Sequence, residues 1–137
     1  METAIAKTNQ QETASYINTI DLAASTENKV KVANAVNAAV SLNGHEGEVL
    51  HVSGVITMPG VRRGRNGAPD TECTNVYLVC DTGEVFFTQS SGVARSVNFI
   101  VALFPDCDAG SGYIPVICKE QQMPNGNSLK TLEIVDE

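Results

Sequence analysis

The sequence of 137 residues has no tryptophan, and it has only four phenylalanines and three tyrosines. Positive charge is also scarce, because nine lysines and arginines stand against sixteen acidic residues, for a net charge of −7. Coating nucleic acid by bulk electrostatic attraction needs many basic residues, so the composition argues against that mechanism. No run of about 18 apolar residues and no basic, apolar secretory start is present, and we therefore expect a cytoplasmic protein that does not span a membrane.

The sequence also lacks the spacings of a metal site or a catalytic centre. No CxxC pair occurs, and His45 and His51 lie upstream of every cysteine at no recognised zinc spacing. A chain of this length can bury a core without a disulfide framework, so we expect reduced thiols that act as small buried apolar residues. We predict that the protein is not an enzyme and uses no metal or cofactor. The cysteines concerned are Cys73, Cys80, Cys107 and Cys118.

Length and composition predict one globular domain. Residues 1–15 are polar and show no apolar periodicity, so we interpret them as a flexible tail. Residues 16–137 are expected to form the domain. Two amphipathic helices are predicted in it: one over about residues 26–42, which Asn43 and Gly44 would stop, and one that Ser90 or Ser91 caps and Pro105 ends.

Five strands are predicted from alternating or β-rich runs. They cover residues 48–58, 74–80, 84–89, 113–121 and 128–135. Gly54 interrupts the first strand and predicts a bulge, with Leu50, Val52, Ile56 and Met58 expected on one face. Residues 59–70, rich in glycine and proline, predict a long loop, and Asn125-Gly126 predicts the last hairpin.

The hairpin between the second and third strands decides which aromatic side chains face outward. A two-residue turn at Thr82 and Gly83 would place Leu78 opposite Phe87 in the core and leave Tyr77 and Phe86 on the outer face. Because Phe86 and Phe87 are adjacent, they lie on opposite faces, and which of them faces solvent depends on this turn.

The order of elements resembles the oligonucleotide/oligosaccharide-binding (OB) fold, a mainly β, five-stranded barrel with a helix between its third and fourth strands, here with an additional N-terminal amphipathic helix. Segments of the chain also resemble single-stranded DNA-binding proteins encoded by phages and conjugative plasmids of Gram-positive bacteria. These segments are 27–39 (ENKVKVANAVNAA), 47–56 (GEVLHVSGVI), 81–83 (DTG), 90–93 (SSGV) and 129–134.

The resemblance implies sequence-tolerant binding of single-stranded DNA, which the protein would protect or handle during replication or conjugative transfer. RNA is left open as a second ligand, and the tail as a means of self-association along the strand. Three of the nine basic residues fall within residues 62–65, and such focused charge, together with aromatic side chains, can hold a single strand. The predicted binding residues are Arg62, Arg63, Arg65, Tyr77, Phe86, Tyr113, Lys119 and Lys130.

The alternative is an OB-type adaptor that binds a protein partner and no nucleic acid, because an acidic barrel with an extra amphipathic helix could serve as an assembly module.

Overall fold

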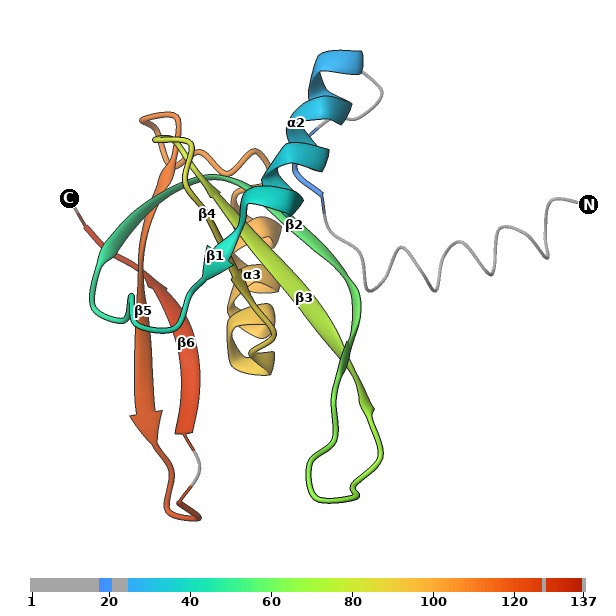
Figure 1. The fold of residues 1–137 in the computed structure, drawn as a ribbon. Coiled ribbons are helices and arrows are strands. Elements are labelled where there is room, and N and C mark those ends of the chain that lie inside the picture. Colours follow the sequence, from blue (N-terminus) through green and yellow to red (C-terminus); the bar gives the residue numbers. More distant parts are fainter. Residues whose placement is uncertain (1–17, 21–24, 127, 137) are drawn as a thin grey trace, which may run out of the picture.

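The computed structural model describes residues 18–20, 25–126 and 128–136. The predicted tail over residues 1–15, with its proposed self-association, lies outside this range. Six strands form one strongly curved sheet, and two helices pack against its two faces (Figure 1). The elements are α2 (Thr26–Ala38), β1 (Val40–Ser41), β2 (Val49–Arg62), β3 (Thr71–Cys80), β4 (Val85–Thr88), α3 (Ser91–Leu103), β5 (Ile114–Gln122) and β6 (Ser128–Ile134). Neither helix in the described part of the chain is long and apolar enough to cross a membrane.

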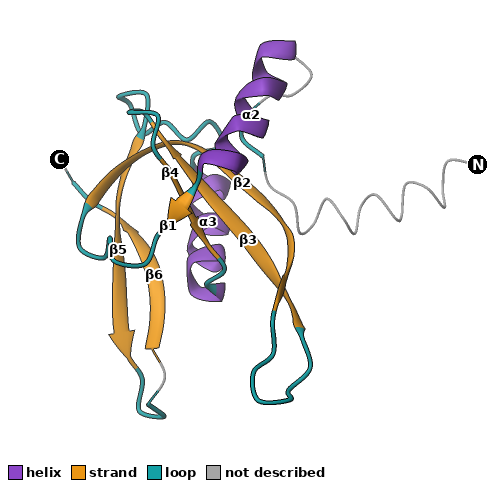
Figure 2. Ribbon diagram, viewed as in Figure 1, coloured by secondary structure: helices purple, strands orange, loops and turns teal. Residues whose placement is uncertain are grey.

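The strand order in the sheet is β1-β4-β3-β2-β5-β6, so β1 and β6 are its two edges. The expectation of a mainly β chain with two helices is confirmed, but the expected strand count of five is wrong. The additional strand is β1, which pairs with β4 in parallel. The curved sheet is thus a half-barrel that stays open between its first and last strands (Figure 2).

The first helix is shorter than predicted, because the chain leaves the helical conformation at Ala39, where ψ is 139°. Val40 then pairs with β4, and the N–H of Leu42 donates to the carbonyl of Phe87 at 2.9 Å. The side chain of Leu42 is fully buried. Strand pairing and burial therefore end the helix before the Asn-Gly stop signal, since tertiary contacts outweigh local propensity. The second helix, capped by Ser90, agrees with its prediction.

The bulge predicted at Gly54 is present, because the pairing of β2 with β3 shifts between Val52 and Gly54. The extra residue reverses the alternation of the strand. Leu50 and Val52 face the main core, whereas Ile56 and Met58 face the opposite side of the sheet. The prediction that all four share one face is wrong, because a period of two cannot be carried through a bulge.

Four residues, 81–84, lie between β3 and β4, and the N–H of Cys80 donates to the carbonyl of Glu84 at 2.8 Å. The turn itself therefore has three residues, 81–83, and ends in Gly83 with a φ of +95°. Three-residue hairpins favour a left-handed glycine at this position. Compared with a two-residue turn, the loop shifts the strand pairing by one residue, so Tyr77 pairs with Phe87. Phe86 turns into the core and is 2 % exposed, so its predicted outward position is wrong.

The loop predicted over residues 59–70 is reduced to 63–70, because β2 continues through Pro59 to Arg62. A proline lacks the N–H that an interior strand donates, and it is tolerated at a sheet edge. β2 pairs with β5 only over residues 49–52, so its second edge is unpaired at Pro59. The result is a long β2–β3 hairpin that extends beyond the body of the protein (Figure 1).

The sheet has an apolar cluster on each face. α3 closes the main core through Val93, Val97 and Ile100. α2 covers the other face, where Ala35 is buried with Ile56 and Tyr77. The sheet face on which Tyr77 was expected to contact a ligand is therefore covered by α2.

Candidate functional site

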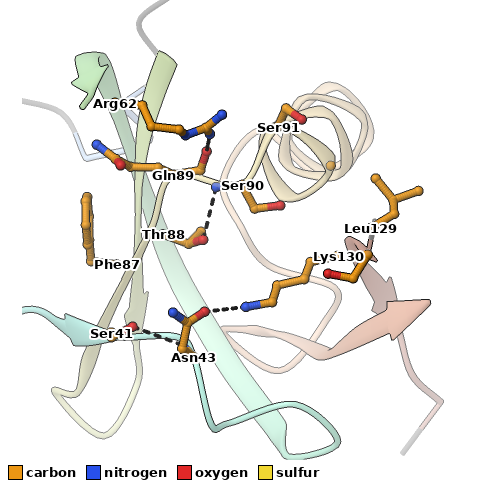
Figure 3. A pocket seen from close by; sticks show the side chains of 12 residues that line it. Ser41, Asn43, Arg62, Phe87, Thr88, Gln89, Ser90, Ser91, Leu129 and Lys130 are labelled. Carbon is orange, nitrogen blue, oxygen red and sulfur yellow. Dashed lines mark hydrogen bonds between the residues drawn. The ribbon is translucent and has the colours of Figure 1, made fainter. Parts of the chain in front are cut away.

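A hollow of about 420 Å³ lies where the open side of the half-barrel meets the start of α3. Figure 3 shows Arg62 at one end of it, Asn43 and Lys130 at the other, and Phe87 and Leu129 on opposite sides. The lining comes from the two edge strands, the β4–α3 junction and the end of β2. The lining residues are Ser41, Asn43, Arg62, Phe87, Thr88, Gln89, Ser90, Ser91, Gly92, Ser128, Leu129 and Lys130.

None of these twelve lining residues is acidic, although the chain carries a net charge of −7. Two are basic. Arg62 is oriented by a bond from its Nη2 to the carbonyl of Gln89, and Lys130 by a bond from its Nζ to Oδ1 of Asn43. The hollow is therefore a local region of positive charge on an acidic protein, which suits an anionic ligand.

Lys130 also links the two edges of the sheet. Its Nζ lies 3.3 Å from a carboxylate oxygen of Glu46, in the segment between β1 and β2. The pKa of Glu46 is lowered, mainly by a hydrogen bond to its own backbone; desolvation opposes this shift, and hydrogen bonds from Lys130 and the backbone of Gly44 add to it. Glu46 is thus a carboxylate that competes with any anionic ligand for Lys130.

The first turn of α3 forms one wall of the hollow. Oγ of Ser90 accepts the N–H of Val93 at 3.3 Å, and the N–H of Ser90 donates to Oγ1 of Thr88 at 3.1 Å. Gly92 is buried against β6, and a Cβ at this position would collide with the carbonyl oxygen of Lys130. Only glycine lets the helix start come this close to β6. A helix N-terminus carries partial positive charge, so this wall adds to the attraction for an anion.

The aromatic side chain at the hollow is Phe87, so the prediction that Phe87 lies in the core is wrong. It is half-buried, and its ring lies 5.1 Å from that of Tyr77, centroid to centroid. Tyr77 itself is only 8 % exposed, so its predicted exposure is wrong. Tyr77 supports Phe87 from within the second apolar cluster instead of offering its own ring to a ligand.

A second hollow, of about 380 Å³, lies between the β2–β3 hairpin and α3. It shares Arg62, Gln89 and Ser91 with the first hollow, so the two are adjacent. Its new cation is Arg95, and its one acidic residue is Glu72. The remaining lining residues are Cys73, Thr74, Ala94 and Asn98.

The other predicted binding residues are dispersed. Arg63 and Arg65 are exposed in the loop at the tip of the β2–β3 hairpin. Lys119 forms an ion pair with Glu133 at 3.1 Å and lines neither hollow. Tyr113 stacks on His51, with ring centroids 4.1 Å apart, just before β5 begins. Of the eight predicted residues, the structure brings Arg62 and Lys130 together.

Three residues that line the two hollows are absent from the binding residues predicted from the sequence: Asn43, Gln89 and Arg95. In the sequence, Asn43 indicates a helix stop and Gln89 the end of a strand. A signal for Arg95 was available, because it lies on the polar side of a helix without acidic residues. What could not be foreseen is that the β2–β3 hairpin lies beside that helix.

The thiols are free, and Cys80, Cys107 and Cys118 are buried. Burial, then the nearby Glu84 and Asp81, raises the pKa of Cys80 to about 11. Cys73, which lines the second hollow, is half-buried. Within the described ranges, no group of three or more histidine, cysteine, aspartate or glutamate residues could hold a metal ion.

The model of the family described as Phage Single-stranded DNA-binding protein matches residues 9–135, which is nearly the whole chain. No curated protein matches, and no solved structure matches.

Proposed function

This chain belongs to the phage single-stranded DNA-binding protein family, and on that basis we propose a binding site for single-stranded DNA. The site is the hollow between Arg62 and Lys130, whose lining has no acidic side chain. The strand would be bound without strong sequence preference and protected during phage replication. The same binding and protection of single-stranded DNA would serve plasmid replication or conjugative transfer. We further propose that β2 to β6 with α3 are an OB barrel to which α2 and β1 are added.

The observation that carries the proposal is the local charge of the hollow. Binding of a single strand needs a positive groove for phosphates and a flat side chain for a base. Arg62 and Lys130 supply the charges at opposite ends, and the N-terminus of α3 lies between them. Phe87 supplies a ring, and Asn43 and Gln89 supply amide groups that can bond to base edges or phosphates.

The test is fluorescence anisotropy of a labelled single-stranded DNA against the matched duplex and an RNA strand of the same sequence. We expect the single-stranded DNA to bind more tightly than the duplex, because a flat ring can stack only on an unpaired base. The RNA titration decides whether the 2′-hydroxyl group is tolerated.

The site itself is tested with the double variant Arg62→Glu/Lys130→Glu. The matched control is Lys119→Glu combined with Arg65→Glu, which changes the net charge equally but alters neither hollow. We expect the first variant to lose binding and the control to retain most of it. Equal losses would mean that overall charge, and not the hollow, determines affinity. No binding of wild type to any strand would favour the protein-adaptor function.

A further inference from the structure

We infer that the bound strand continues past Arg62 onto the outer face of α3, where Arg95 holds a phosphate and Phe99 stacks on a base. This inference rests on the proposed function and extends it to a surface that the predicted residues do not include. The sheet face that would otherwise offer aromatic rings is covered by α2, which leaves Tyr77 8 % exposed.

The path is set by the two adjacent hollows. Arg62 and Gln89 line both, so a strand that contacts Arg62 in the first hollow reaches the second without leaving the protein surface. In the second hollow it meets Arg95 and Asn98, which both project from α3. α3 has no acidic residue along its length, so nothing on the helix repels a phosphate.

Phe99 lies one helical turn beyond Arg95, and residues four apart lie on the same face of a helix. Its side chain is 68 % exposed, whereas the other phenylalanines and tyrosines of the described segments are buried or half-buried. An exposed ring next to a cation matches what a single strand requires, because bases and phosphates alternate along it. Because the protein has few aromatic residues, an exposed ring beside a cation indicates a contact surface for a base.

The absence of tryptophan allows a direct optical test. Phe99→Trp introduces one tryptophan, whose emission can be excited separately from that of the three tyrosines, and it keeps a flat ring at the proposed contact. Val30→Trp is the control, because Val30 is 51 % exposed on α2, which covers the other face of the sheet, and it lines neither of the two hollows. Each variant is titrated with oligothymidylates of about 6 and about 16 nucleotides, lengths within the range of site sizes of one OB fold.

We expect the longer oligonucleotide to quench the fluorescence of Phe99→Trp and the shorter one, held in the first hollow, to leave it nearly unchanged. Val30→Trp should respond to neither oligonucleotide. Equal quenching in the two variants, or no quenching of Phe99→Trp while anisotropy reports binding of the longer strand, would overturn the inference.

Affinity provides the second measurement. Phe99→Ala removes a stacking contact and should weaken binding of the longer oligonucleotide by about fivefold or more. Arg95→Glu should weaken it as well, while both variants bind the shorter one like wild type. If Arg62→Glu/Lys130→Glu loses binding while Arg95→Glu and Phe99→Ala bind the longer oligonucleotide like wild type, only this extension is refuted. Retained binding in the double variant would refute the proposed function itself.

Discussion

Salt dependence gives the sharpest quantitative test of the hollows, because it counts the phosphates that the protein neutralises. Three cations line them, namely Arg62, Arg95 and Lys130. For single strands, the logarithm of the binding constant falls with the logarithm of the salt concentration with a slope of about −0.7 per neutralised phosphate. Three contacts therefore predict a slope of about −2. A fourfold increase in salt should then weaken binding by roughly 20-fold.

The perturbation is Arg62→Gln, which removes one positive charge while keeping a side chain that can donate hydrogen bonds. We expect the slope to become less steep by about 0.7. Lys119→Gln is the control, since it lowers the net charge by the same amount at a residue that is already paired with Glu133 and lines neither hollow. Its slope should equal that of wild type.

The assay is anisotropy of a labelled oligothymidylate of about 16 nucleotides at several salt concentrations between about 50 and 200 mM. A wild-type slope near zero would refute electrostatic binding of the strand. A wild-type slope near −3.5 would mean that about five phosphates are neutralised, so that further cations take part. Arg63 and Arg65, at the hairpin tip, would then be the first to mutate. Equal slopes for Arg62→Gln and wild type would refute a phosphate contact at Arg62.

Three further predictions concern the surroundings of the hollows. Glu46→Gln should strengthen binding of single-stranded DNA by up to about fivefold, because it frees Lys130 from a competing carboxylate. The measurement is anisotropy, and weaker binding would mean that Glu46 only positions Lys130. Gly92→Ala should lower the melting temperature by a few degrees. The clash with β6 costs roughly 1–3 kcal/mol, which exceeds the gain of about 0.5–1 kcal/mol in helix propensity. Ser91→Ala, at an exposed neighbouring residue, should change the melting temperature little. A maleimide should label Cys73 faster than the three buried thiols, and bound DNA should slow the reaction, whereas unchanged labelling would exclude a strand from the second hollow.

The sequence by itself determined the local elements, because they depend on short-range patterns. The spacing of apolar residues and the Ser90 cap predicted α3, which the structure confirms over Ser91–Leu103. The Asn-Gly pair predicted the last hairpin, where the N–H of Gly126 donates to the carbonyl of Met123 at 3.0 Å. The glycine in the first strand likewise predicted a bulge that is present.

Tertiary structure decided which side chains reach the site. A loop longer by one residue exchanged the faces of Phe86 and Phe87, since side chains alternate along a strand. β1 formed because Val40 and Ser41 found a partner in β4, which no local pattern indicates. Arg62 and Lys130 are 68 positions apart in the sequence and line one hollow only because the sheet curls and leaves its edges open. The sequence therefore specified α3, the bulge, the last hairpin and the scarcity of positive charge, and long-range pairing decided where that charge gathers.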